Sequence, residues 1–203
     1  MRERTREAVR EDIRRTAVAL FAERGFDAVR TEEIAAASGI SARSFFRYFA
    51  TKEDVLVSGA AAVGSQVRDR LASRPSDEDL WTSLRHALDV ALDMMEAFGP
   101  LNFTAMTVIM TTPALRASHF EKHLVWEEAL LPEIAARLSE DVASTAVRTW
   151  AHTAMGCLDV ALFEWVRLDA AQTLPSLLNQ AFATVSGLPS PATQQKPSSP
   201  SSS

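Results

Sequence analysis

The chain has 203 residues, of which 47% are hydrophobic, so it can bury a sizeable core in one large domain or in two smaller ones. It contains no run of 18 apolar residues, and its Arg- and Glu-rich start lacks the apolar stretch of a signal peptide, so neither a membrane span nor export is expected. Because Cys157 is the single cysteine, no internal disulfide can form, and the cytoplasm is the simplest expected location.

Charge is divided unevenly along the chain. Residues 1–52 contain 11 Lys and Arg against 8 Asp and Glu, whereas residues 53–203 contain 10 against 18. A basic first part on an acidic remainder suits a protein that docks one end on a polyanion, although such a split also arises by chance.

Helical periodicity runs through almost the whole chain and strand signals are nearly absent, which predicts an all-α fold of about nine helices. The first helix is expected over residues 7–24, with an apolar stripe, and ends at Gly25. Thr31 is expected to cap a short second helix that ends at Gly39, and Ser41 to cap a third that runs to about Phe49. The stripe consists of Val9, Ile13, Ala17, Leu20 and Phe21.

Longer helices are expected after Thr51, which can cap a fourth helix running to about Ser73. Thr112 and Pro113 form a strong helix start, and Pro132 predicts a kink or restart before that helix ends at Leu138. The other helices are expected over residues 76–98, 101–110, 141–168 and 171–186. The Ser-, Pro- and Gln-rich remainder predicts a disordered tail, so the expected domains are residues 1–54, 55–187 and 188–203.

The segment from Thr31 to Lys52 has the pattern of a helix-turn-helix. Ile34, Ala35 and Ile40 supply an inner face, Gly39 permits a tight turn, and Phe45 and Phe49 point inward at a spacing of four. Arg43 and Arg47 are left facing outward. Because a major groove admits one helix and Arg can bind guanine bidentately, the pattern predicts DNA binding. The alternative, a helical hairpin with solvated arginines, does not account for the turn, the caps and the arginines together.

This part of the chain resembles the DNA-binding domain of the TetR family of bacterial transcriptional regulators. The resemblance covers roughly residues 8–57 and rests on Leu20-Phe-Ala-Glu-Arg-Gly-Phe26, Thr31-Glu-Glu-Ile-Ala, Gly39-Ile-Ser and Phe49-Ala-Thr-Lys-Glu-Asp-Val-Leu56. It implies a three-helix head that contacts DNA through Thr31, Ser41, Ala42, Arg43, Ser44, Phe46, Arg47, Tyr48 and Lys52.

Three positions depart from the family pattern. Phe46 stands where the family usually has a tyrosine that reaches a phosphate, and Tyr48 stands where it often has a histidine. Tyr48 can supply the missing hydroxyl. Arg43 replaces a residue that is usually small. Arg43 and Arg47 are therefore the expected base readers, and Thr31, Tyr48 and Lys52 the expected phosphate contacts.

The resemblance also implies that residues beyond about 55 form a dimerising, ligand-sensing domain. Methionines suit adaptable apolar pockets, and an apolar or amphipathic small-molecule effector is expected, although each candidate is also compatible with a plain core position. Asn102 can orient a ligand or serve as a local cap. The candidate ligand-binding residues are Met94, Met95, Phe98, Phe103, Met106, Met110, Trp126, Trp150 and Met155.

Small residues between Trp150 and Trp165 allow close helix crossing, as at a dimer interface or in tight packing within one chain. The resemblance favours a homodimer through the long C-terminal helices, with Leu124, Ala129 and Leu131 contributing from the preceding helix. The small residues are Ala151, Thr153, Ala154, Gly156, Cys157 and Ala161. Cys157 is expected to be a small buried apolar group rather than a reactive thiol.

Histidines raise the possibility of other chemistry. His119 and His123, with Glu127 one turn further, have a spacing that can chelate a metal, but a solvated polar face is the usual explanation, so no metal or cofactor is predicted. His152 and Asp159 share a helix face and can form a polar spot in the core. His86 and Asp89 are expected to form a surface pair.

Taken together, these patterns predict a homodimeric, ligand-responsive repressor that binds a pseudo-palindromic DNA operator. The alternatives are an activator, or a regulator that responds to a protein with the same head. An all-helical enzyme is a weaker rival, because no nucleophile motif, HExxH, phosphate loop or paired-carboxylate signature occurs, and no catalytic residues are predicted.

Overall fold

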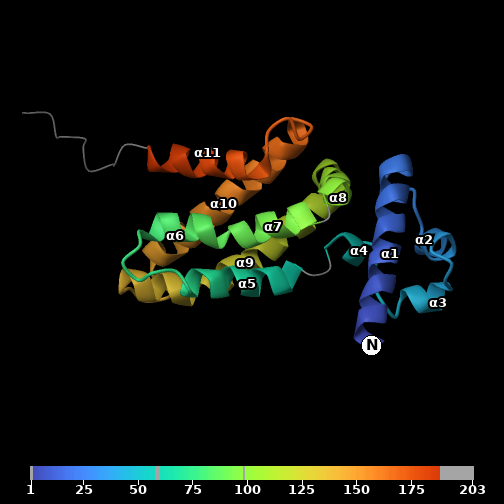
Figure 1. Cartoon of the computed structure of the whole chain (residues 1–203), viewed down its shortest axis with the longest axis horizontal. Coiled ribbons are helices and arrows are strands. Elements are labelled where there is room, and N and C mark those ends of the chain that lie inside the picture. The colour runs from blue at the N-terminus through green and yellow to red at the C-terminus, as the bar shows by residue number, and fades with distance from the viewer. Residues whose placement is uncertain (1, 58–59, 98, 188–203) are drawn as a thin grey trace, which may run out of the picture.

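The computed structural model describes residues 2–57, 60–97 and 99–187. Within these residues the chain forms eleven helices and no strand, which confirms the predicted all-α class with more, shorter helices than expected. Figure 1 shows two parts: a head made of α1–α3, and a longer body of stacked helices, with α4 and α8 between them. The tail predicted over residues 188–203 lies outside the described residues.

The head consists of α1 (Arg2–Arg24), α2 (Thr31–Ala37) and α3 (Ala42–Phe45). Its core is the predicted apolar stripe of α1 packed against α2 and α3, with Ile13, Phe21, Ile34 and Phe45 all at most 1% exposed. Gly25 has a φ of 83°, a left-handed conformation that suits glycine, so the first helix ends where the sequence predicts.

Two predicted helices each correspond to two described elements. The helix expected from Thr51 to Ser73 is described as α4 (Asp54–Val57) and α5 (Ala60–Ala72), and residues 58–59 lie outside the described residues. The helix expected over 76–98 forms α6 (Leu80–Ala87) and α7 (Asp89–Ala97). At this second junction the Ala91 N–H donates to the Leu88 carbonyl three residues back. The backbone therefore forms one tighter, 3₁₀-like turn between α6 and α7.

The remaining helices are α8 (Gly99–Thr111), α9 (Pro113–Leu138), α10 (Thr145–Arg167) and α11 (Leu174–Ser186). Pro113 occupies the first turn of α9 as predicted, and α9 continues through Pro132 without a restart. In the body, α9 packs along α5, α8 and α10, and α10 in turn packs against α11. None of the helices in the described ranges is long and apolar enough to span a membrane.

The head is joined to the body mainly through α1, which contacts α8 and α4. One hydrogen bond at this junction runs from Nη2 of Arg14 on α1 to Oδ1 of Asn102 on α8, at 2.5 Å. The amide nitrogen of Asn102 donates to the carbonyls of Met94 and Met95 at the end of α7. A continuous chain of contacts therefore links the head to the helices of the body.

Candidate functional site

The helix-turn-helix is built largely as the sequence predicts. Gly39 has a φ of 69° at the turn between α2 and α3, and Oγ of Ser41 accepts a hydrogen bond from the Ser44 N–H at 3.1 Å, which caps α3. Phe45 and Phe49 are buried, with ring centroids 5.7 Å apart. Because these two rings face the core, the opposite side of α3 faces outward.

The predicted cap of the second helix is wrong by one residue. Arg30 is the N-cap, with extended backbone, and Thr31 is the first helical residue. The carboxylate of Glu33 accepts a hydrogen bond from the Arg30 N–H at 2.8 Å. Because the Glu33 side chain can reach back one turn, it provides a hydrogen-bond acceptor for the free backbone N–H at the start of α2. Thr31 is half-buried beside it.

The outward face carries the predicted base readers. Arg43 and Arg47 are exposed, and the Arg47 guanidinium lies 5.4 Å from the centre of the Tyr48 ring. Phe46, where the family pattern has a tyrosine, is 54% exposed. The other predicted DNA-contacting residues of this segment, Ser41, Ala42 and Ser44, lie at the exposed or half-buried start of α3.

Lys52, predicted as a phosphate contact, is engaged within the head. Its Nζ donates to the carbonyls of Phe26 and Val29 at 2.9 and 3.1 Å and lies 4.2 Å from the centre of the Phe26 ring. The ammonium therefore holds the turn between α1 and α2. No local sequence pattern indicates this role, because the two carbonyls lie more than twenty residues away in the chain.

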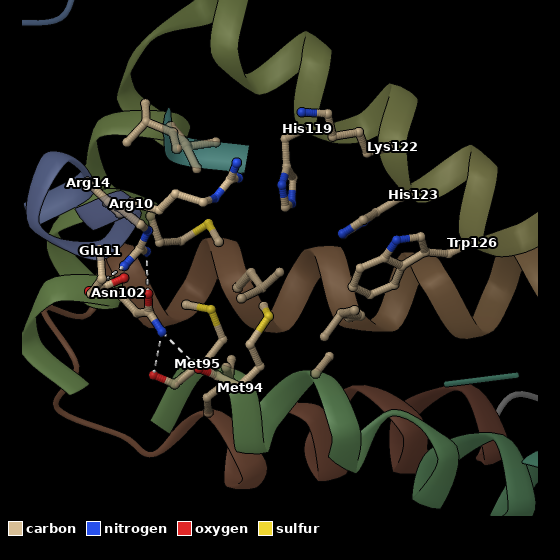
Figure 2. Close-up of a pocket in the computed structure, with 18 of the residues that line it drawn as sticks. Arg10, Glu11, Arg14, Met94, Met95, Asn102, His119, Lys122, His123 and Trp126 are labelled. Atoms are coloured by element: carbon tan, nitrogen blue, oxygen red, sulfur yellow. Dashed lines mark hydrogen bonds and ion pairs between the residues drawn. The ribbon is translucent and has the colours of Figure 1, made fainter. Parts of the chain in front are cut away.

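A cavity of about 540 Å³ lies where the head meets the body. Figure 2 shows Arg10, Glu11 and Arg14 of α1 at one end of it, and His119, Lys122, His123 and Trp126 of α9 along one side. Its inner wall is apolar and comes from α7, α8 and α10, and Leu174 adds the start of α11. These apolar lining residues are Ala91, Met94, Met95, Ala105, Met106, Ile109, Leu158, Leu162 and Leu174.

The structure brings together four of the nine predicted ligand-binding residues, namely Met94, Met95, Met106 and Trp126, which all line this cavity. Phe103 lies instead beside a second hollow of about 360 Å³ between α1 and α8, where it packs edge-on against Trp165. Phe98 lies outside the described residues.

The other three candidates are not among the residues that line the cavity. Trp150 packs against Trp81 at a ring distance of 5.5 Å, and Met110 and Met155 are buried core residues. Helical spacing alone does not distinguish a cavity wall from a packed core, because both require apolar side chains.

Cationic residues line the cavity on the side of the head. Arg10 donates to the Tyr48 carbonyl at 2.8 Å, and Arg14 lies 3.7 Å from a carboxylate oxygen of Glu11. Burial lowers the pKa of Arg14, an effect that Glu11 partly offsets. Burial also lowers the pKa of Lys122, and Asp54 offsets part of that change. No local sequence pattern indicates that these cations share a cavity, because only the tertiary fold brings α1 alongside α9.

The predicted solvated face of α9 is wrong for two of its three residues. His119 and His123 are 8% and 4% exposed, because α9 packs against helices on several sides. Burial, followed by the neighbouring His123, lowers the pKa of His119 to about 3, so its ring is neutral. Glu127 accepts a hydrogen bond from His152, at 3.0 Å between His152 Nδ1 and a carboxylate oxygen.

The predicted polar spot formed by His152 and Asp159 is also wrong. His152 is exposed and pairs with Glu127, whereas Asp159 contacts His123, with 2.5 Å between Oδ1 and Nδ1. Both side chains reach α9, but they contact different residues of it, so a spacing of seven did not bring them together. The predicted pair of His86 and Asp89 is present, at 3.4 Å.

The residues predicted for a dimer interface are divided between the core and the surface, and of those on α9 Leu124 is exposed. Ala151, Ala154, Cys157 and Ala161 are buried within the chain, so these small residues serve packing inside it, and Leu131 is buried as well. Burial raises the pKa of Cys157 to about 11, as expected for an inert thiol. The exposed large apolar residues of α9 and α10 are Phe120, Leu124, Val125, Val160 and Phe163.

Two family descriptions match the chain. Residues 13–58 match the bacterial regulatory proteins of the tetR family, and residues 78–188 match the MftR C-terminal domain. The protein of Mycobacterium tuberculosis (strain H37Rv) named as mycofactocin biosynthesis transcriptional regulator MftR is 30% identical over 182 residues, which cover 90% of this chain and 91% of that protein.

Solved structures share the fold. The fatty acid degradation regulator FadR from Bacillus halodurans aligns with a TM-score of 0.63 at 20% identity, covering 88% of this chain and 95% of that one. The Thermus thermophilus FadR, solved in complex with lauroyl-CoA, aligns with a TM-score of 0.56 at 22% identity, covering 95% of this chain and all of that one. With its helix-turn-helix head, its helical body and these matches, the chain belongs to the TetR family of bacterial transcriptional regulators.

Proposed function

We propose that this protein is a homodimeric repressor that leaves its DNA operator when an amphipathic anion of the acyl-CoA class fills the cavity between head and body. In this proposal residues 1–54 act as the DNA-binding head and residues 55–187 as the sensing and dimerising body. The single observation that carries the proposal is the position of the cavity, which is lined by α1 of the head and by α7–α10 of the body.

The DNA contacts are proposed from the outward face of α3. Arg43 and Arg47 are exposed at the start and just after the end of that helix, where side chains meet base edges in the major groove. Ser41, Ser44, Tyr48 and Thr31 are placed around them to contact phosphates. Lys52 acts mainly through the head itself, because its ammonium already binds two carbonyls.

The chemistry of the cavity supports the effector class. Its volume of about 540 Å³ falls within the usual range for small-molecule sites, which is about 300–1,000 Å³. The apolar inner wall suits an acyl chain, and the cations near α1 and Lys122 suit the phosphates of a coenzyme A head. The T. thermophilus FadR, which shares the fold, binds lauroyl-CoA in its solved structure.

A route from effector to head follows from the same contacts. Arg14 lines the cavity and also donates to Asn102, so an anion bound near Arg14 competes with the bond that ties α1 to α8. Two arrangements of α1 against the body then differ in their affinity for the effector. Such a difference is sufficient for the effector to shift the population of head positions.

The dimer is proposed through the outer faces of α9 and α10. Their cross-helix pairs run in opposite order, with His123 beside Asp159 and Glu128 beside Arg148, so the two helices are antiparallel. This places Phe120 of α9 at the same level as Phe163 of α10, and both are exposed in the single chain. A second copy of the same face can cover them.

The effector proposal is tested by calorimetric titration of the full chain with lauroyl-CoA, dodecanoate and coenzyme A. We expect lauroyl-CoA to bind most tightly, because it alone engages both the apolar wall and the cations. Lys122→Gln should weaken it about tenfold or more, the usual loss for a charged contact. Arg116→Gln removes the same charge from an exposed position of α9 outside the cavity and should leave binding unchanged. Equal losses in the two variants, or no binding of lauroyl-CoA, would contradict the proposal.

A further inference from the structure

Two histidines of α9 are buried side by side at the cavity. His119 and His123 are one helical turn apart, their ring centroids are 4.2 Å from each other, and both rings line the cavity. Figure 2 shows the two side chains reaching from α9 into the space above the apolar wall. Neither histidine is needed for the effector contacts described above.

A carboxylate from the neighbouring helix completes the group. Oδ1 of Asp159 on α10 lies 2.5 Å from Nδ1 of His123. One donor atom from each of His119, His123 and Asp159 can be chosen so that all three atoms lie within 4.8 Å of one another. The antiparallel packing of α9 and α10 holds these three residues in one place although they are up to 40 positions apart in the sequence.

A second, independent observation concerns His119 alone. Its Nε2 is buried and has no hydrogen-bond partner among the described residues. Buried polar atoms in folded proteins are almost always satisfied, so a nitrogen of this kind indicates a missing ligand. His119 is only 8% exposed and borders the cavity, from which a ligand can enter.

We propose that His119, His123 and Asp159 bind a divalent transition-metal ion of the Zn²⁺ class, with one coordination position open to the cavity. Two imidazoles and one carboxylate are a donor set that suits Zn²⁺ and its neighbours, whereas Mg²⁺ and Ca²⁺ prefer oxygen donors. Three protein ligands and a free fourth position are typical of zinc sites that are accessible to small molecules.

Metal binding requires the three donor atoms to move only slightly closer together. Bonds of about 2.0–2.1 Å to a tetrahedral ion place the donor atoms about 3.3 Å apart. In the structure the three donor atoms lie within 4.8 Å of one another, so they need to approach slightly. The His119 ring can turn towards the other two groups, because one side of it faces the open cavity. In the metal-free chain the contact between His123 and Asp159 already holds two of the three ligands together.

The inference is tested on the full, tag-free chain after treatment with a chelator, by titration with Co²⁺ followed by competition with Zn²⁺. We expect one ion per chain, the visible absorption bands of four-coordinate Co²⁺, and loss of those bands when Zn²⁺ is added. No DNA or acyl-CoA is present, so this result and the tests of the proposed function can fail separately. A wild-type chain without these bands and without saturable Zn²⁺ uptake would overturn the proposal.

Variants assign the ligands. His119→Gln and His123→Gln should each weaken binding more than about 100-fold, whereas His152→Gln, which removes an exposed histidine of α10, should bind as the wild type does. Asp159→Asn should also exceed the roughly 10–100-fold loss that follows removal of a group which only orients a ligand. A smaller loss would overturn the assignment of Asp159, and equal losses in His119→Gln and His152→Gln would overturn the site. Circular dichroism of each variant verifies that it is folded.

Discussion

At the residue scale, Arg43 stands where the family usually has a small residue, and this difference provides a side chain that can read a base. Its side chain is exposed on the first turn of α3, where an arginine can bind guanine with two hydrogen bonds. We expect Arg43→Ala to reduce the preference for one base pair of the operator, at a cost of about 1–3 kcal/mol. Fluorescence anisotropy on operators that differ at single positions measures this preference.

A matched control separates base reading from general charge. Arg70→Ala removes an exposed arginine from α5 in the body and should leave sequence preference unchanged. If Arg43→Ala weakens binding to all sequences equally, Arg43 contacts a phosphate rather than a base.

Lys52 leads to a different prediction, because its ammonium bridges two carbonyls of the turn between α1 and α2. We expect Lys52→Ala to lower the free energy of unfolding by about 1.5–3 kcal/mol, the usual range for hydrogen bonds to a charged group. Arg47→Ala should leave it nearly unchanged, because that side chain is exposed. Urea unfolding compares the two variants, and equal stabilities would show that Lys52 has no structural role.

At the element scale, the turn between α5 and α6 is held by a partly buried polar network. Glu78 accepts hydrogen bonds from Arg74 at 2.7 Å and from Ser83 at 2.6 Å, and Arg137 of α9 donates to Ser83 and to carbonyls of the turn. The bonds from Arg74 and then Ser83 lower the pKa of Glu78 from 4.5 to about 2.

This network predicts a dependence of stability on pH. Because the pKa of Glu78 is lower in the folded chain, its contribution is fully present above about pH 4.5 and is lost as the pH falls towards 2. Thermal unfolding should therefore show Glu78→Gln less stable than the wild type at pH 6, with the difference shrinking between pH 5 and pH 2. Glu121→Gln, an exposed control on α9, should follow the wild type throughout. A difference between Glu78→Gln and the wild type that stays constant with pH would contradict this account.

The elements themselves were largely predictable, because each has a local signal. Gly25, Gly39, Ser41 and Pro113 mark helix ends that the structure confirms. The N-cap of α2 was not predicted correctly, because Thr31 and Arg30 compete for that position and the reach of the Glu33 side chain decides between them. Where such a signal is absent the prediction is less accurate: α1 begins at Arg2 rather than near residue 7, and α6 begins at Leu80 rather than near residue 76.

At the scale of the whole molecule, what the sequence could not reveal is which helix faces meet. His119 and His123 have the spacing of a solvated stripe, yet they are buried, because α9 is packed on several sides. Met110 and Met106 have similar surroundings in the sequence, and of the two only Met106 lines the cavity. Arg10 and Arg14 of α1 line the same cavity, although they precede Met106 by nearly a hundred residues in the sequence. These features depend on tertiary packing, which periodicity within one helix does not record.

The proposed dimer is also a property of the whole molecule. We expect Phe163→Glu to convert the dimer to a monomer, because it places a charge in the centre of the apolar face formed with Phe120 and Val160. Light scattering after gel filtration measures the mass. Asp169→Lys changes charge at an exposed position beyond the end of α10 and serves as the control. A chain that is monomeric before the substitution, or dimeric after it, would contradict the proposed interface.

Effector-controlled DNA binding can be measured by footprinting the full chain on the promoter region of its own gene, with and without lauroyl-CoA. We expect salt-sensitive protection of a pseudo-palindrome whose half-sites lie about 34–36 Å apart, and loss of that protection when lauroyl-CoA is added. Binding without sequence preference, or protection that lauroyl-CoA leaves unchanged, would contradict the proposed function.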